Sequence, residues 1–224
     1  MSDLPFPLPD DVAARLRLAL DRERKIARAL EALGPLAGRD VLVVGGGPDE
    51  LARYAGEGAR VATVDADAPP WPVEDASVDA VISCWSAFRG VDDALIEEVD
   101  RVLRPDGRLL VVHDYGRDDV SRLRGDLPEY GQWSRRDGPF LSSGFRVRVI
   151  HCFWTFDGLD DAKSFLESAF GPAGAEVAGR LKRPRLSYNV AIYHRTRGGA
   201  AGRASEPASV PVTTGGGGMA VAFA

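Results

Sequence analysis

The stretch that decides the fold is Val41-Leu42-Val43-Val44-Gly45-Gly46-Gly47-Pro48-Asp49 and its continuation to Asp65. Four apolar residues predict a buried strand, three glycines break it, and a second strand ends on Asp65. A backbone without Cβ can turn sharply off a strand and press against a ligand that a larger residue would exclude. An acidic residue about 20 positions further on can accept two hydrogen bonds from a ribose diol. The stretch is therefore typical of a nucleotide-cofactor site.

The last glycine position of the cofactor-binding pattern distinguishes between cofactors. A nicotinamide or flavin fingerprint requires Gly-x-Gly-x-x-Gly, but Glu50 stands where its last glycine should be. An NAD-linked oxidoreductase is therefore the weaker alternative. Further along, residues 78–83 are typical of a buried strand, and residues 103–112 of a helix end, a turn and a strand. Together these segments resemble the class I S-adenosylmethionine-dependent methyltransferases, in particular the methyltransferase type 11-like group.

Two segments carry the resemblance most specifically. In residues 103–110 a Leu-Arg-Pro-Gly-Gly-like turn feeds the fifth strand, with Asp106-Gly107 in the place of the two glycines. Residues 67–79 are similar to the family's loop on the adenine side of the cofactor, with Asp67-Ala68 at its start. The resemblance implies an α/β fold: a Rossmann-like, mostly parallel sheet with helices on both faces and an antiparallel strand at the C-terminal end. It also implies S-adenosyl-L-methionine as cofactor.

The chain is shorter than the family pattern after the second strand. The family normally separates the ribose-binding acid from the adenine-loop acid by a helix and an edge strand, but here only Ala66 lies between Asp65 and Asp67. An edge strand can be lost without opening the middle of a sheet. We therefore predict a sheet reduced at one edge and a more open cofactor pocket. Residues 60–64 would form an exposed edge through which an oligomer is possible.

The resemblance also implies a set of cofactor-binding residues at the strand ends, which are Gly45, Gly47, Asp49, Asp65, Asp67, Ala68 and Trp85. Two positions depart from the family. Val43 stands where the family usually carries Asp or Glu, which helps to hold the methionine amino group. Asp49 stands where the turn would have its last glycine, and its side chain can cap the following helix. These departures leave open a second class of function, a catalytically silent methyltransferase-like domain with a binding or regulatory role.

Candidate catalytic residues follow the fifth strand directly. His113 and Tyr115 lie there, and a histidine at a strand end can take a proton from a hydroxyl as a methyl group moves. The alternative is that His113 caps the strand end and meets water. Tyr130, Trp133 and Phe140 either line an aromatic substrate pocket or pin a loop to the core. The three histidines of the chain show no paired spacing, so no metal site is expected.

The methyl acceptor is expected to be a small molecule. Residues 83–86 end the fourth strand with Ser-Cys-Trp-Ser, where amino-group methyltransferases of nucleic acids carry Asn/Asp-Pro-Pro-aromatic. The net charge of −5 also argues against a general nucleic-acid binder. The short basic run over residues 180–185 is interpreted as a solvated loop.

Composition fits one catalytic-type domain, since 224 residues with 45% apolar and 27% charged residues can bury one sizeable core. We expect an N-terminal helix within residues 1–35, packed on the core, a methyltransferase-like domain over residues 36–196 and a disordered Gly/Ala/Ser-rich tail over residues 197–224. Within the domain, helices are expected at residues 49–55, 118–127 and 159–170 and strands at residues 145–156 and 188–194.

The lack of a long apolar run or a signal-peptide pattern favours a cytoplasmic protein without membrane partners.

Overall fold

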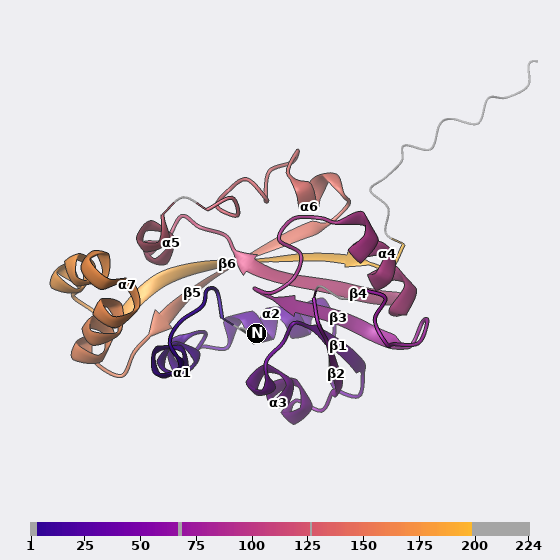
Figure 1. The fold of residues 1–224 in the computed structure, drawn as a ribbon, viewed down its shortest axis with the longest axis horizontal. Helices are drawn as coiled ribbons and strands as arrows, with labels where there is room; N and C mark the ends of the chain where they lie inside the picture. Colours follow the sequence, from indigo (N-terminus) through magenta and orange to yellow (C-terminus); the bar gives the residue numbers. More distant parts are fainter. Residues whose placement is uncertain (1–3, 67–68, 126, 199–224) are drawn as a thin grey trace, which may run out of the picture.

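The computed structural model describes residues 4–66, 69–125 and 127–198 (Figure 1). The predictions made for Asp67, Ala68 and the tail beyond residue 198 therefore lie outside the described residues. One sheet runs through the molecule with its strands in the order β2-β1-β3-β4-β6-β5. The strands are β1 (Asp40–Val44), β2 (Arg60–Val64), β3 (Val78–Cys84), β4 (Leu103–Asp114), β5 (Arg146–Thr155) and β6 (Arg185–Thr196).

Strand directions confirm the predicted fold class. β1 pairs in parallel with β2 and β3, and β3 pairs in parallel with β4. β6 is antiparallel to both β4 and β5, and so forms the predicted antiparallel end. After β2 the chain reaches β3 without a helix or strand among the described residues 65–66 and 69–77. β2 is accordingly an edge of the sheet, as the shortened sequence predicts, while oligomerisation through it stays a prediction.

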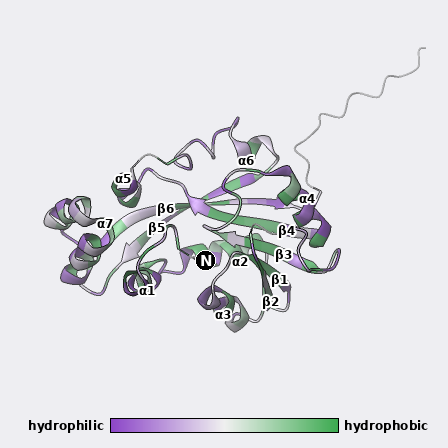
Figure 2. Ribbon diagram, viewed as in Figure 1, coloured by the Kyte–Doolittle hydropathy of each residue, from purple (hydrophilic) through white to green (hydrophobic). Residues whose placement is uncertain are grey.

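The central strands are buried on both faces, because helices cover both sides of the sheet. Alternate residues of each strand enter different cores: Val41, Val43 and Ile82 belong to one, and Leu42 and Val44 to the other. Figure 2 shows the resulting apolar central strands. The helices are α1 (Asp10–Ala19), α2 (Lys25–Leu33), α3 (Pro48–Gly56), α4 (Asp93–Val102), α5 (Asp119–Arg124), α6 (Pro139–Ser142) and α7 (Leu159–Arg180). Buried residues of α1, α2, α3, α5 and α7 share the first core, and those of α4 and α6 the second.

The prediction of a single N-terminal helix is wrong, because the chain turns between α1 and α2. Asp21 and Arg24 both adopt a φ of 53°, which interrupts the helix. The Asp21 carboxylate accepts hydrogen bonds from the backbone N–H groups of Lys25 (2.6 Å) and Ile26 (2.9 Å). An apolar stripe that suits one long helix also suits two short ones, so the periodicity did not reveal a break made by an aspartate cap.

The helix predicted over residues 159–170 is present but continues further. Gly171 has φ 56° and ψ −131°, and Pro172 follows it, so α7 consists of two helical halves joined at a kink. The second half ends at Arg180, inside the basic run interpreted as a loop from sequence. The run therefore spans a helix end, a short connection and the start of β6.

The turn predicted within residues 103–110 lies inside the observed β4, the strand that corresponds to the fifth strand of the family pattern. Asp106 adopts a φ of 66°, and a Cβ on Gly107 would lie 2.8 Å from the carbonyl oxygen of Arg104. The pairing register between β3 and β4 shifts at this place, between Val78 and Ala80. The Asp-Gly pair thus matches the backbone that the turn requires. Within the described part of the chain, no helix is long and apolar enough to cross a membrane.

Candidate functional site

The glycine turn lies at the carboxyl end of β1 and requires glycine at its first position. Gly45 has a φ of 71°, and its N–H donates to the carbonyl oxygen of Val64 at 2.8 Å. A Cβ on Gly45 would lie 2.8 Å from the Cβ of Ser86 and 3.9 Å from that of Ala66. The turn therefore brings the ends of β1, β2 and β3 into close contact, at the edge where ligands bind in open α/β sheets.

The start of α3 presents backbone N–H groups beside this turn. Its N-cap is Gly47, which makes no side-chain cap hydrogen bond, and Pro48 occupies the first turn. The expectation that Asp49 caps the helix is wrong, since Asp49 lies inside the first turn and its carboxylate pairs with the Arg17 guanidinium of α1 at 3.5 Å. A helix start of this kind favours an anionic group such as a carboxylate.

Asp65 follows β2 and is exposed. Its backbone carbonyl accepts a hydrogen bond from the Trp71 indole at 3.1 Å, and the Trp71 N–H donates to Glu98 of α4 at 2.7 Å. The loop after β2 is therefore anchored by buried groups, while the Asp65 carboxylate stays accessible next to the glycine turn.

A buried carboxylate, that of Glu50, lies behind the glycine turn. The Glu50 side chain is 1% exposed, lies 3.3 Å from the Tyr54 hydroxyl and pairs with Arg53 at 3.7 Å. Glu50 lines a cavity of about 160 Å³ together with Asp49 and Trp85. That volume is below the roughly 300–1,000 Å³ of whole small-molecule sites, so it suits one end of a larger ligand.

Trp85 joins this cavity to the carboxyl end of β4. It is buried, adopts a φ of 51°, and its indole N–H donates to Asp114 Oδ1 at 3.1 Å. Asp114 also accepts hydrogen bonds from the Tyr188 hydroxyl and from Arg124, whose side chain is 10% exposed. Burial raises the pKa of the Asp114 carboxyl, and the Arg124 charge acts in the opposite direction. The Asp114 carboxylate is therefore already engaged by hydrogen bonds and an ion pair within the protein.

His113 is also enclosed, so the expectation that it meets water is wrong. Its Nε2 lies 3.1 Å from the carbonyl oxygens of both Ala87 and Phe88. Carbonyls only accept hydrogen bonds, so Nε2 carries the proton. Burial, together with the Arg89 charge, lowers the pKa of His113 to about 3. These contacts favour a structural role that holds the loop after β3 over the predicted role as a base.

The aromatic residues after β4 close over His113. Trp133 packs edge-on against the His113 ring with centroids 5.0 Å apart, and the Phe140 ring stacks on Tyr193 at 4.0 Å. Both Trp133 and Phe140 are buried, so they pin this segment to the core, which was one of the two interpretations of their sequence positions. Tyr115 is only half-buried, with the Arg117 guanidinium 5.8 Å from its ring centre. Tyr115 is therefore the more accessible of the two predicted catalytic residues.

Sequence reasoning missed Glu50, Ser86 and Asp114 as parts of this region. Ser86 Oγ donates to the Val44 carbonyl at 2.6 Å and lies 3.0 Å from Ser83 Oγ, which ties the loop after β3 to β1. The spacing of Glu50 and Tyr54, one helical turn apart, is the signal that could have indicated a buried pair. Among the described residues, no group of three or more His, Cys, Asp or Glu side chains could hold a metal ion.

Comparison with known proteins agrees with this geometry. Residues 26–111 match a family model described as a methyltransferase domain. No curated protein sequence matches the chain. Among solved structures, the chain is similar to the YcgJ protein of Bacillus subtilis, with 16% identity, a TM-score of 0.43 and coverage of 81% of this chain and 100% of that one. It is also similar to an S-adenosylmethionine-dependent methyltransferase of Aquifex aeolicus, with 17% identity, a TM-score of 0.43 and coverage of 83% and 98%.

The resemblance to methyltransferases rests on the match over residues 26–111 and on the strand order, because both structural similarities have TM-scores below 0.5. The matched segment contains the glycine turn and the parallel strands from β1 to most of β4. The match and the strand order support a class I methyltransferase family for the segment that they cover. The general chemistry that the match indicates is methyl transfer.

Proposed function

We propose that this protein transfers a methyl group from S-adenosyl-L-methionine to a small-molecule acceptor. The observation that carries the proposal is the convergence of three groups at the glycine turn: the amides at the start of α3, the Glu50 carboxylate and the exposed Asp65 carboxylate. Their chemistry complements the three polar parts of the cofactor, which are a carboxylate, an ammonium group and a ribose diol.

Each group has one task in this proposal. The N–H groups of the first turn of α3 bind the carboxylate of the cofactor, and Glu50 binds its ammonium group in place of the acid that Val43 cannot supply. Asp65 accepts hydrogen bonds from the ribose, and Trp85 forms part of the wall between cofactor and acceptor. The bound cofactor supplies an electrophilic methyl group on a sulfonium. The protein aligns that methyl with the acceptor and excludes water from it.

The acceptor is proposed to approach from the side of Tyr115. Tyr115 is half-buried, whereas His113 and Asp114 on the same strand end are enclosed by their own partners. We assign His113 the task of holding Ala87 and Phe88, which follow Trp85 in the loop after β3. A small acceptor suits a strand end at which Trp133 and Phe140 already fill the space behind His113.

Calorimetric titration with S-adenosylmethionine and S-adenosylhomocysteine tests the proposal. The wild-type protein is expected to bind both in the micromolar range. Asp65→Ala is expected to weaken binding by roughly tenfold or more, since hydrogen bonds to a charged group contribute about 1.5–3 kcal/mol. Asp160→Ala is the matched control, because Asp160 is an exposed aspartate in the first turn of α7.

Glu50→Gln extends this test to the buried carboxylate. It preserves the size of the side chain and removes its charge, so it is expected to weaken binding of both compounds while the thermal midpoint of the apo protein changes little. Equal affinity of the Glu50→Gln and wild-type proteins would assign the ammonium group to another residue.

A second candidate function, a silent domain that binds a partner, is favoured by one feature of the turn. The Ser86 side chain occupies the space in front of Gly45, and Val43 packs against Gly46. Both are contacts of the protein with itself at positions that a cofactor would approach. Folded wild-type protein that binds neither compound at millimolar concentration would overturn the methyltransferase proposal and favour this second function. Binding of NAD instead would revive the oxidoreductase alternative.

A further inference from the structure

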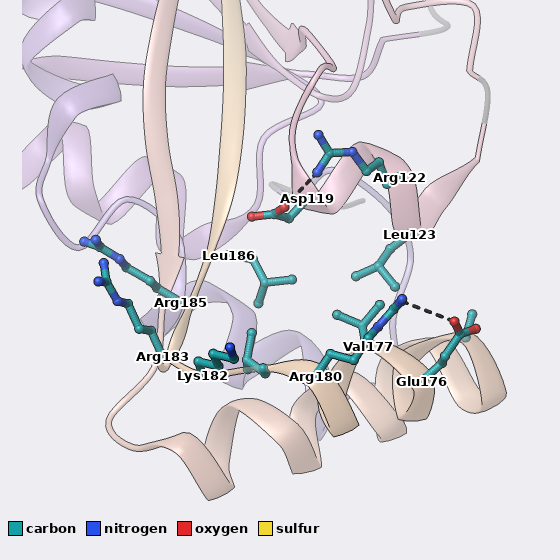
Figure 3. A pocket seen from close by; sticks show the side chains of 12 residues that line it. Asp119, Arg122, Leu123, Glu176, Val177, Arg180, Lys182, Arg183, Arg185 and Leu186 are labelled. Carbon is teal, nitrogen blue, oxygen red and sulfur yellow. Dashed lines mark hydrogen bonds and ion pairs between the residues drawn. The ribbon is translucent and has the colours of Figure 1, made fainter.

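A larger cavity lies at the other end of the sheet, between α5, the second half of α7 and the start of β6. Its volume is about 680 Å³, which falls within the range of small-molecule sites. Figure 3 shows the side chains of Leu123, Val177 and Leu186 pointing toward one another across it. These three come from three different elements, so the cavity exists only where tertiary packing brings them together. It lies apart from β1, β2 and the glycine turn (Figure 1).

The walls of this cavity are fixed by hydrogen bonds. Asp119 Oδ2 accepts from the backbone N–H of Ser187 at 3.0 Å and from its hydroxyl at 2.6 Å, which ties α5 to β6. Asp118 caps α5 and also accepts from the Asn189 N–H at 2.8 Å. On the opposite side, the break of α7 at Gly171 sets the direction of the second half of the helix. The cavity is therefore a built feature and not a gap between loose segments.

The rim of the cavity is strongly cationic in a chain whose net charge is −5. Five basic and two acidic side chains line it, and the basic ones are Arg122, Arg180, Lys182, Arg183 and Arg185. Arg183 and Arg185 lie to one side in Figure 3, and the Arg185 guanidinium stacks 4.6 Å from the Phe153 ring centre. Lys182 lies below Leu186 in the same view, and the Arg180 side chain extends past Val177 toward Glu176, to which a dashed line joins it.

The existing ion pairs at the rim are weak enough for an anionic ligand to replace their acidic partners. Arg180 pairs with Glu176 at 3.2 Å, but the two side chains are 71% and 73% exposed. Such exposed pairs contribute little because water and salt screen them. An anionic ligand whose apolar part covers Leu123 and Val177 would bind the same guanidinium in a less hydrated setting, where the attraction is stronger.

We propose that this cavity binds a small amphipathic anion, with an aromatic or alkyl body against Leu123, Val177 and Leu186 and its carboxylate or sulfonate on Arg180 and Lys182. The cationic rim selects the anionic group, and the apolar centre selects the body.

Fluorescence and calorimetric titration with 8-anilinonaphthalene-1-sulfonate tests the site on the folded full-length protein. We expect one saturable site and a dissociation constant about tenfold higher in the double variant Arg180→Gln/Lys182→Gln, since charge-assisted contacts are lost. The control is Arg146→Gln/Arg148→Gln, which removes the same charge from exposed positions of β5 and should change affinity less than twofold. Octanoate is expected to displace the probe, and octanol at the same concentration is not.

Two further variants distinguish binding in this cavity from binding at the surface or at the glycine turn. Val177→Asp places a charge in the apolar centre and should abolish probe binding while the thermal midpoint stays near that of the wild type, since Val177 is half-buried near the end of α7. Asp65→Ala should leave probe binding unchanged, so the result is independent of whether the protein binds S-adenosylmethionine. The proposal is overturned by equal losses in the two double variants, by the absence of saturable binding, or by tighter binding of an oligonucleotide or acidic peptide to the same residues.

Discussion

The carboxyl ends of β1 and β2 differ sharply from the carboxyl end of β4, although the three strands are parallel and these ends lie along the same side of one sheet. At β1 and β2 the glycine turn, the uncapped start of α3 and the exposed Asp65 leave polar groups available to a ligand. At β4 the polar groups are already used, because His113 bonds two carbonyls and Asp114 bonds Arg124, Tyr188 and Trp85. A position at a strand end is therefore not sufficient for a functional role.

The segments that follow the strands account for the difference. A glycine turn and a short helix follow β1, so little protein covers that end. A segment of about thirty residues separates β4 from β5, and it carries Arg124, Trp133 and Phe140 back over the strand end. Enclosure converts side chains that could do chemistry into side chains that hold the structure together. Four measurements test this contrast between an open and an enclosed end.

The largest effect is expected at the enclosed end. Asp114→Ala leaves Arg124 without its buried carboxylate and removes the acceptor of the Tyr188 and Trp85 donors, so the free energy of unfolding should fall by about 3–5 kcal/mol. Urea denaturation at pH 7 measures this. Asp137→Ala is the control, since that side chain is 80% exposed beside Arg135, and it should change stability by less than about 0.5 kcal/mol. A loss as small as that of the control would show that the buried cluster does not stabilise the fold.

The second effect is a dependence of stability on pH that comes from His113. Its pKa is lowered to about 3 in the folded protein, whereas the unfolded chain binds a proton near pH 6.5. The unfolded state therefore holds one more proton between these values, and stability falls as pH drops from 6.5 toward 3, by up to about 1.4 kcal/mol per unit. Unfolding midpoints at pH 7, 6, 5 and 4 should fall less steeply for His113→Gln than for the wild type. If the midpoints of the two proteins fall equally steeply with pH, His113 is in contact with water in the folded protein.

The third effect concerns the open end, where ligand affinity and stability should separate. Asp65→Ala is expected to lose roughly tenfold in affinity for S-adenosylhomocysteine while its free energy of unfolding changes by less than about 0.5 kcal/mol. Comparison of its thermal midpoint with and without the ligand measures both quantities in one experiment. A large loss of apo stability would mean that Asp65 belongs to the enclosed class of residues.

The smallest effect is expected at the opposite ends of these strands, where Asp40 begins β1 and where we propose no ligand site. Hydrogen bonds from Arg60 and Arg104 lower the pKa of Asp40 to about 2. The stabilising contribution is present above the ordinary pKa near 3.9 and is lost as pH falls toward 2. Asp40→Asn should therefore lower the urea midpoint slightly at pH 7, and its difference from the wild type should shrink as pH falls from 4 toward 2. A difference that stays constant between pH 4 and pH 2 would assign the effect to packing.

Much of the fold could be predicted because its signals are local. The glycines after Val44 mark a turn, residues 78–83 alternate between two cores, and the single residue between Asp65 and Asp67 excludes another helix and strand. Each of these follows from the chain geometry of a few neighbouring residues. The break between α1 and α2 escaped because an aspartate cap interrupts the helix without interrupting the apolar periodicity.

The site was predicted less well, because accessibility is not a local property. His113 and Tyr115 are two residues apart and equivalent by sequence, yet one is enclosed and the other is half-buried. The enclosure depends on Trp133, which comes from a segment twenty residues away. The cationic run at residues 180–185 has the composition of a solvated loop, and only the packing of α5 against α7 shows that it borders a cavity.

The strands, the glycine turn, the reduced edge and the resemblance to methyltransferases all follow from the amino-acid sequence, because backbone conformation and strand burial depend on residue types at short range. Which polar side chains are free to bind a ligand follows only from the folded molecule. Burial, hydrogen-bond partners and pKa depend on groups brought together from distant parts of the chain, and no short-range pattern records them.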